Sequence, residues 1–351
     1  MPNLTRASCE QLDADDPLRA WRDEFILPIA ADGVAYLAGH SLGALPKRAI
    51  ASVQRTVTDE WGDQAVRSWS DADWMDLPRR IGDKIAPLIG ALPGEVLVAD
   101  STSVNLFKLL GGALRLRPDR RTILTVDENF PTDLYITQAA SELFSDHPID
   151  RVSQADLFAD PDRYLSDDVC VVTLSPVDFR DGALYDIENL TRVAHEHGAL
   201  VLWDLSHCVG VIPVDLHSMQ ADLAVGSTYK YLSGGPGAPA FLFIAERWRD
   251  ALRPTLPGWM GHQAPFDFAP TYAPADGIER HLSRTPPILS FTALDATSKN
   301  VIAPRMAEAL MPSRRTSFTP RPPCAKEMPR SPCTRLPIQR PNCSGMESSR
   351  P

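Results

Sequence analysis

A lysine between two tyrosines is the residue of this sequence best suited to nucleophilic chemistry. Lys230 lies in the stretch GSTYKYLSGGPG, which begins at residue 226, directly after an apolar run of strand type and directly before a glycine-rich turn. A lysine in a half-buried site has a depressed pKa and can attack an aldehyde. A lone lysine is more often an ordinary surface residue, so this interpretation needs support from elsewhere in the chain.

An aspartate at the end of another apolar run gives the first support. Asp204 follows the run VLW at residues 201–203, and His207 comes three residues later. A carboxylate at the C-terminal end of a buried parallel strand points into the crevice where α/β sheets bind ligands. It destabilises the fold there unless it has a cationic partner. The alternatives are that Asp204 caps the next helix and that His207 is a hydrogen-bonded core histidine.

A turn rich in hydroxyl groups lies about a hundred residues before the aspartate. The stretch ADSTSVN begins at residue 99 and joins a strand-type run to a helical one. The free N–H groups and the positive end of the dipole at a helix start bind anions, and Thr102 and Ser103 can add hydroxyl hydrogen bonds to a phosphate. The alternative is ordinary N-capping by serine and threonine.

Together these three features match what an enzyme needs in order to use pyridoxal 5'-phosphate. A lysine forms a Schiff base with the aldehyde of the cofactor, and an aspartate holds a proton on the pyridine nitrogen so that the ring accepts electrons. A helix start takes the phosphate. In this chain Lys230, Asp204 and the pair Thr102 and Ser103 can fill these roles.

The elements that must position these residues follow from the apolar pattern. Between about residues 47 and 244, short apolar runs alternate with stretches of helical period, which predicts an α/β domain with a mostly parallel sheet. We expect strands at 95–99, 122–126, 169–174, 199–203, 222–225 and 240–244. We expect helices at 78–92, 104–116, 132–145, 187–197 and 288–296. Glycine and proline predict a loop-rich segment from 254 to 287.

Composition and charge exclude several classes of protein. The chain has 351 residues, 44% hydrophobic and 23% charged, which is typical of a globular protein. Its net charge of −10 argues against a surface for nucleic acid or anionic membrane. No run of residues is apolar for long enough to span a bilayer. The acidic N-terminal stretch is unlike a signal peptide, and no CxxC pair supports a metal site. We therefore expect a cytoplasmic protein without a metal.

The ordered set of motifs resembles the kynureninase family, whose members are fold-type-I pyridoxal phosphate enzymes related to the class V aminotransferases. The resemblance extends from about residue 36 to 296. The matching stretches are YLAGHSLGALP at 36, STSVNLFKLL at 101, NFPTDLY at 129, WDLSHCVGVIPVDL at 203, STYKYLSGGPGAPAFL at 227, PGWMGH at 257 and RTPPILS at 284. The resemblance implies a mostly parallel, seven-stranded type of sheet between helices.

The resemblance also implies a reaction and a set of site residues. The reaction is hydrolysis of L-kynurenine, or its 3-hydroxy form, to anthranilate or 3-hydroxyanthranilate and L-alanine, in tryptophan catabolism and NAD biosynthesis. Lys230 and Asp204 would be catalytic, with Tyr229 in proton transfer. The cofactor-binding residues would be these three with Thr102, Ser103, Phe130, Pro131, Thr132, Asp133, Ser175, His207, Trp259 and Thr285.

Within this set, the resemblance gives most members a separate role. Phe130 would stack on the cofactor ring, and Tyr229 would help the helix start to hold the phosphate. Trp259 and Thr285 would reach the cofactor of the partner subunit in a homodimer. The alternatives are that Phe130 belongs to the core, that Trp259 is an interface anchor and that Ser175 is a turn residue.

The sequence departs from the family at two positions and at its C-terminal part. His40 replaces an asparagine, and Arg284 replaces a glycine. If that glycine needs positive φ or a close approach, Arg284 would displace Thr285 and weaken the partner's cofactor site. The family continues into a small domain whose arginine binds the substrate carboxylate, whereas residues 304–351 hold ten prolines, nine basic residues and no apolar periodicity.

These observations predict three parts: an N-terminal segment 1–35, a large cofactor-binding domain 36–298, and a disordered tail 299–351. We expect the small domain to be largely missing, through a shifted reading frame or an error in the gene model. Two alternatives to kynurenine cleavage stay open. One is a cofactor-binding protein without turnover. The other is another fold-type-I lyase such as a cysteine desulfurase, which would need a reactive cysteine on a mobile loop.

Overall fold

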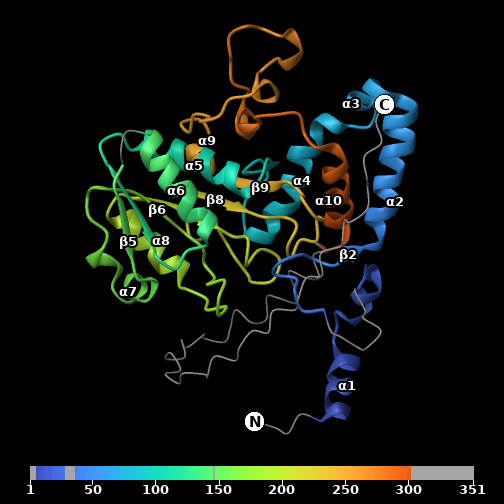
Figure 1. Ribbon diagram of the computed structural model, residues 1–351, viewed down its shortest axis with the longest axis horizontal. Helices are drawn as coiled ribbons and strands as arrows, with labels where there is room; N and C mark the ends of the chain where they lie inside the picture. Colours follow the sequence, from blue (N-terminus) through green and yellow to red (C-terminus); the bar gives the residue numbers. More distant parts are fainter. Residues whose placement is uncertain (1–4, 28–35, 145–146, 302–351) are drawn as a thin grey trace, which may run out of the picture. The chain divides into compact units, whose positions relative to one another are not determined.

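Seven short apolar strands form the sheet that organises the chain (Figure 1). The computed structural model describes residues 5–27, 36–144 and 147–301. The strand order is β3-β9-β8-β7-β6-β4-β5. The strands are β3 (Val96–Ala99), β4 (Thr122–Val126), β5 (Ile149–Val152), β6 (Val169–Leu174), β7 (Leu200–Asp204), β8 (Leu223–Gly226) and β9 (Ala240–Ile244).

The direction of the strands brings six of their C-terminal ends to one edge of the sheet. Strands β8, β7, β6, β4 and β5 are parallel to one another. Strand β9 is antiparallel to both of its neighbours, β3 and β8, so β3 again runs in the direction of β8. The C-terminal ends of all strands except β9 therefore share an edge, which is where α/β sheets bind ligands.

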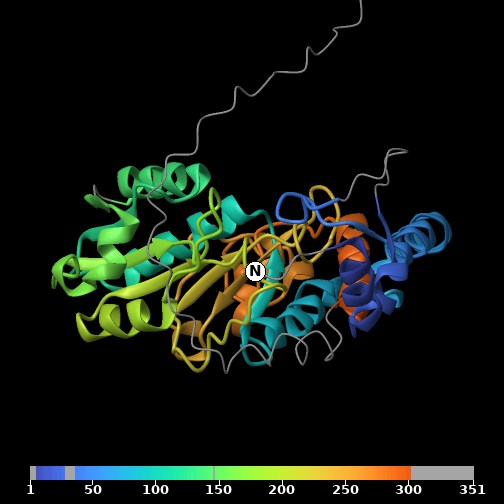
Figure 2. The same ribbon diagram turned by 90° about the horizontal axis from the view of Figure 1, so that it is seen from below.

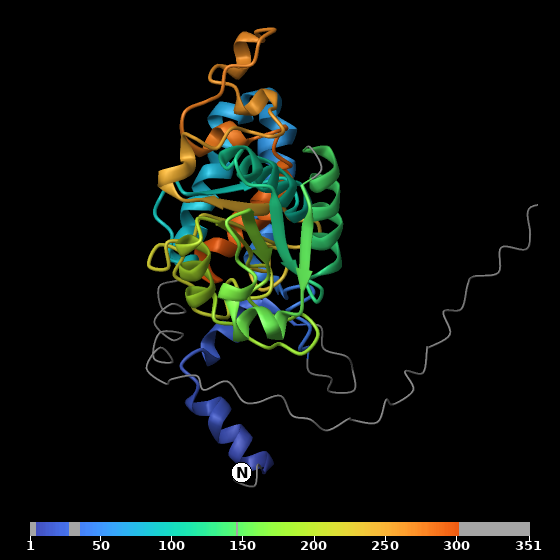
Figure 3. The same ribbon diagram turned by 90° about the vertical axis from the view of Figure 1, so that its left-hand side faces the viewer.

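Helices cover both faces of the sheet (Figure 2). On one face, side chains such as Leu200 and Leu202 of β7 pack with α5 (Thr102–Leu116) and α6 (Pro131–Leu143). On the other, Val201 and Trp203 pack with α4 (Leu77–Ile85), α8 (Ile187–Glu196) and α10 (Ile288–Val301). Strands covered on both faces are apolar throughout, which is why the sequence shows runs and not alternation. Helix α6 lies against β4 and β5 (Figure 3).

The predicted strands are confirmed, and the helices need one correction. The helix expected at 78–92 ends earlier: α4 stops at Ile85, and the turn of 3₁₀-helix η5 (Ala86–Ile89) leads to Gly90. Gly90 has φ +61°, and a Cβ there would lie 2.6 Å from the Cα of Asp215. This left-handed residue in close contact with backbone ends the helix.

Several elements were not predicted. They include α1 (Arg6–Asp15), α2 (Lys47–Arg55), the following π-helical segment η2 (Thr56–Gln64), α7 (Gln154–Ala159), α9 (Glu246–Arg249) and strand β5. The expected loop-rich segment 254–287 is confirmed and contains only the short 3₁₀ turns η7 (Trp259–Gly261), η8 (Pro265–Asp267) and η9 (Gly277–His281). Of the expected tail, residues 302–351 lie outside the described residues.

The described residues contain neither a candidate membrane-spanning helix nor a candidate metal-binding cluster. Within residues 5–27, 36–144 and 147–301, no helix combines the length and apolar character that crossing a membrane requires. The same part of the chain holds no group of three or more histidine, cysteine or acidic residues that could bind a metal ion.

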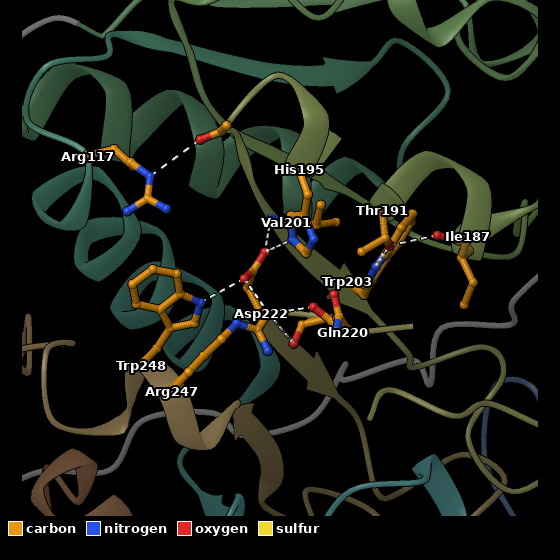
Figure 4. A network of polar contacts seen from close by, with 12 residues as sticks. Arg117, Ile187, Thr191, His195, Val201, Trp203, Gln220, Asp222, Arg247 and Trp248 are labelled. Carbon is orange, nitrogen blue, oxygen red and sulfur yellow. Dashed lines mark hydrogen bonds and ion pairs between the residues drawn. The ribbon is translucent and has the colours of Figure 1, made fainter. Parts of the chain in front are cut away.

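A buried carboxylate joins three elements at the opposite edge of the sheet (Figure 4). One oxygen of Asp222 accepts the backbone N–H of Val201 at 2.8 Å and lies 2.8 Å from Nε2 of His195. The other accepts the indole N–H of Trp248 at 2.7 Å and a hydrogen bond from Arg247 at 2.6 Å. Burial alone would raise the pKa of Asp222, but hydrogen bonds, first from His195, outweigh it, and the pKa is lowered.

Replacing Asp222 by alanine is expected to lower the free energy of unfolding at neutral pH by about 3 kcal/mol, because the buried donors of Val201 and Trp248 lose their acceptor. The contribution of a carboxylate with a lowered pKa is present above its unfolded value of about 3.9 and is lost as the pH falls further. The difference between wild type and variant should therefore shrink in acid.

Urea unfolding at neutral pH and in acid measures this effect. Glu196→Ala is the matched control, because Glu196 forms an exposed ion pair with Arg192 on α8. Such a pair contributes less than about 1 kcal/mol. Equal losses of unfolding free energy in the two variants would show that the buried contacts of Asp222 stabilise the fold no more than an exposed ion pair does.

Candidate active site

The residues predicted to do chemistry follow the strand ends at one edge of the sheet. Thr102 and Ser103 come after β3, Phe130 to Asp133 after β4, and Ser175 directly after β6. Asp204 is the last residue of β7, and Lys230 lies four residues after β8. Residues far apart in the sequence thus meet because parallel strands end together.

Lys230 is the centre of this group. Its side chain is buried, with 7% of the residue exposed. Its Nζ lies 2.8 Å from Nε2 of His207 and 5.5 Å from the centre of the Phe130 ring. The rings of Phe130 and His207 are 5.9 Å apart, and Phe130 also packs edge-on against Phe179. The amine therefore lies in a small cage with an imidazole and a phenyl ring.

Burial lowers the pKa of Lys230, and the carboxylates of Asp204 and Asp133 only partly oppose this effect. The pKa of His207 is lowered as well, first by burial and then by the charge of Lys230, with a smaller contribution from His40. His207 is therefore neutral at pH 7. If its Nε2 accepts from Lys230, its Nδ1 carries the proton. That Nδ1 is buried and has no hydrogen-bond partner within the described residues.

Two buried carboxyl groups lie beside the amine. Asp204 accepts the backbone N–H of Ser206 at 2.9 Å. The pKa of Asp133 is raised well above its ordinary value, first by burial and then by the charge and hydrogen bond of Asp204. The raised pKa keeps the Asp133 carboxyl group protonated. Its neighbour Asp204 is the carboxyl group whose charge opposes the effect of burial on Lys230.

A pocket opens at the start of α5, where the sequence predicts an anion site. Ser101 caps this helix by accepting the N–H of Val104 at 3.3 Å. A pocket of about 410 Å³ opens in front of it, lined by Asp100, Ser101, Thr102, Val104, Tyr229, Gly237, Ala238 and Arg284. Burial, and then the charge of Asp204, raises the pKa of Tyr229, which therefore keeps its proton. The pocket combines a helix start, two hydroxyl groups, a phenol and a guanidinium, which is a donor set for a phosphate. Ser103 does not line it.

The sequence analysis missed two charged residues that support this turn. Asp100 has φ +45°, and its carboxylate accepts from Nζ of Lys108 at 2.8 Å. Lys108 is 1% exposed and also donates to the backbone carbonyl of His281 at 2.6 Å. Burial lowers the pKa of Lys108, while Asp100 opposes the shift. A lone lysine in the apolar stretch LFKLLGG was the available signal, since a buried lysine needs a partner.

The remaining predicted residues lie in three places. Ser175 donates to the carbonyl of Val177 at 3.1 Å, so its contacts are those of a turn residue. Pro131 and Thr132 begin α6 next to Phe130. Trp259 and Thr285 are both exposed and contact each other at 3.3 Å, outside the pocket at the start of α5.

The backbone strain considered for Arg284 is not present. Arg284 is not among the described residues with positive φ, so its backbone does not require glycine. The hydrogen bond between Trp259 and Thr285 is intact beside it. Displacement of Thr285 by the arginine is therefore not supported.

Comparison with known proteins agrees with this geometry. The family model of aminotransferase class V matches residues 36–309. The kynureninase of Deinococcus radiodurans is 47% identical over 84% of this chain and 72% of its own length. Those of Burkholderia pseudomallei (strain 1106a) and Pseudomonas fluorescens are 46% and 44% identical, each over 83% of this chain and 70% of their own.

Similar solved structures share the fold at low identity. A variant of C-DES with glycine covalently linked to its PLP cofactor has a TM-score of 0.71 and 19% identity, covering 82% of this chain and 76% of that one. A cysteine desulfurase from Thermococcus onnurineus has a TM-score of 0.65 and 20% identity, covering 85% and 72%. At this identity the likeness establishes the fold alone.

Proposed function

The chain belongs to the aminotransferase class V family and, within it, to the kynureninases, and from this we infer that it hydrolyses L-kynurenine to anthranilate and L-alanine with pyridoxal phosphate. The identity of 44–47% over more than four fifths of the chain carries this conclusion. The site adds an independent physical argument, because its residues have the charges and positions that the cofactor needs. The 3-hydroxy form of the substrate has the same scissile bond.

The described residues fit the cofactor at both ends. The unpartnered Nδ1 of His207 and the buried carboxyl groups of Asp133 and Asp204 suit a polar, protonated ring, and the pocket at the start of α5 suits the phosphate. When bound, pyridoxal phosphate supplies an electrophilic aldehyde carbon and a ring that accepts electrons from bonds around the substrate's α-carbon. We propose that Lys230 and Asp204, with Phe130, His207, Thr102 and Tyr229, hold it.

Lys230 can both bind and move protons. Because burial lowers its pKa, the amine is available without its proton nearer to neutral pH than in an exposed lysine. His207 orients it through the 2.8 Å contact between Nζ and Nε2. An oriented amine at Nζ can take the α-proton of a bound amino acid and return it elsewhere.

Asp204 and Tyr229 complete the proton inventory. Asp204 would hold a proton on the ring nitrogen of the bound cofactor, while the raised pKa of Asp133 keeps that neighbour protonated. Tyr229 keeps its phenolic proton and can donate it to a carbanion or an oxyanion that forms during cleavage. Water must add to the γ-carbonyl of the substrate before the Cβ–Cγ bond breaks.

We also propose a homodimer with shared sites. Trp259 and Thr285 lie outside the pocket of their own chain, in the loop-rich segment 254–287, part of which projects from the body in Figure 1. Trp259 packs edge-on against Phe266, and Phe266 against Phe268, and all three rings are exposed. A cluster of exposed aromatic residues is typical of an interface.

Two further expectations remain proposals. Residues 36–298 form the large cofactor-binding domain, and the protein works in the cytoplasm, where the free thiols of Cys9, Cys170 and Cys208 would stay reduced. Among the cysteines that the structure describes, none supports a desulfurase. Burial raises the pKa of Cys170 to about 12 and also raises that of Cys208, so neither is a nucleophile at neutral pH. Cys9 lies on α1, which carries no predicted site residue.

A direct assay tests the function. The purified chain with pyridoxal phosphate should show the visible absorbance of a lysine-bound cofactor, and adding L-kynurenine should produce the fluorescence of anthranilate. Absorbance without anthranilate would support a cofactor-binding protein without turnover. Cysteine in place of kynurenine serves as the control substrate, because release of sulfide would indicate a desulfurase.

A further inference from the structure

Arg284 is a second cation, besides Lys108, at the start of α5, where we propose that the phosphate of the cofactor binds. Nε of Arg284 is 3.5 Å from a carboxylate oxygen of Asp100, and the arginine lines the same pocket as Thr102 and Tyr229. Its side chain is 60% exposed, so it can move within the pocket. None of the hydrogen bonds between described residues uses Arg284, and its guanidinium donors therefore remain available to a ligand.

Two cations lie against the carboxylate of Asp100. The carboxylate of Asp100 already has a short contact with the buried Lys108, at 2.8 Å, while Arg284 is farther away at 3.5 Å. Two cations against one carboxylate leave one positive charge. That charge lies at the start of α5, where the helix dipole is also positive. An anion with more than one charge would balance both.

The shape of the guanidinium suits a phosphate. Arginine presents its donors in a planar fork that binds two oxygens at once, which glycine cannot do. The pocket volume of about 410 Å³ leaves room for such a group between Thr102, Tyr229 and Arg284.

We propose that Arg284 is an additional phosphate-binding residue for the cofactor, at a position where the resemblance to the family implies glycine. The proposal rests on the proposed function only in requiring that pyridoxal phosphate is bound. It reverses the expectation from the sequence, in which the arginine weakens cofactor binding. Restoring glycine should therefore loosen the cofactor.

The test compares two ligands that differ only in the phosphate. Apoprotein of wild type, Arg284→Gly and Arg284→Gln is titrated with pyridoxal phosphate and, separately, with pyridoxal, and the absorbance of the lysine-bound form is recorded. We expect both variants to bind pyridoxal phosphate roughly five- to twenty-fold more weakly, since a hydrogen bond to a charged group is lost. Their affinity for pyridoxal should be unchanged. The loss should be smaller at high salt.

Arg192→Gln is the matched control, since Arg192 is 58% exposed and pairs with Glu196 on α8. It should bind both ligands like wild type. Thermal unfolding with inorganic phosphate gives a second readout, and phosphate should stabilise wild-type apoprotein more than Arg284→Gly. Equal or tighter binding of pyridoxal phosphate by Arg284→Gly would overturn the proposal, as would equal weakening of both ligands. A wild-type protein that binds the cofactor but forms no anthranilate would contradict the proposed function and leave this comparison intact.

Discussion

Replacing Lys230 by alanine is expected to lower kcat for kynurenine cleavage by at least about ten-thousand-fold, because one change removes both the covalent anchor and the proton-transferring amine. The visible absorbance of the lysine-bound cofactor should disappear at the same time. Lys230→Arg should be equally inactive, because a guanidinium keeps its proton at every accessible pH and cannot act as a nucleophile. Anthranilate fluorescence and the absorbance spectrum measure the two effects.

The control for this prediction is Lys47→Ala, since Lys47 is an exposed residue at the start of α2. It should match wild type in rate and spectrum. The circular dichroism of Lys230→Ala should also match, because removing a buried amine that lies among His207 and Phe130 relieves a desolvation penalty. Visible absorbance or substantial turnover that survives in Lys230→Ala would show that another amine carries the chemistry.

The sequence predicts the central sheet and most of the site for a common physical reason. Strands covered on both faces must be apolar along their whole length, so β6 and β7 appear as uninterrupted runs. Because such strands are parallel, polar residues at their ends converge. The positions of Asp204 and Lys230 can therefore be inferred without coordinates.

Other elements lack such a signal. Strand β5 is the outermost strand on one side of the sheet and pairs only with β4. Its sequence IDRV includes two charged residues, which an outermost strand tolerates. Helix α2 buries only Ala49, so its sequence has little apolar character from which to predict it. A helix can be predicted from the sequence when it buries an apolar face, because packing of that face, more than intrinsic propensity, stabilises helices in proteins.

The cluster at the start of α5 could not be predicted from spacing. Arg284 and Asp100 are brought together by the fold, and the left-handed φ of Asp100 is a local exception that glycine or asparagine would usually fill. Whether Arg284 strengthens or weakens cofactor binding also depends on where its side chain lies. From the sequence, Arg284 is expected to do harm through positive φ or close approach, whereas in the structure its φ is not positive and its side chain lines the pocket.

The second large effect is expected at Asp204. Asp204→Asn should lower kcat by about a hundred- to a thousand-fold, the range seen when a buried group that stabilises charge in a transition state is lost. Asp133→Asn should cost far less, because Asp133 is the protonated member of the pair and an amide can donate the same hydrogen bond. The two variants remove carboxyl groups that touch each other, so the comparison separates charge from packing. Steady-state rates with saturating cofactor measure both.

The double variant gives the sharpest form of this argument. In Asp204→Asn, Asp133 no longer faces a neighbouring negative charge, and one of the causes that raise its pKa is removed. Asp133 can then ionise and partly replace the lost charge, so Asp133→Asn combined with Asp204→Asn should be slower than Asp204→Asn alone by more than Asp133→Asn costs by itself. If the two effects multiplied independently, or if Asp133→Asn were the slower single variant, the assignment of the charge to Asp204 would be wrong, and the ring-side carboxylate would have to be Asp133.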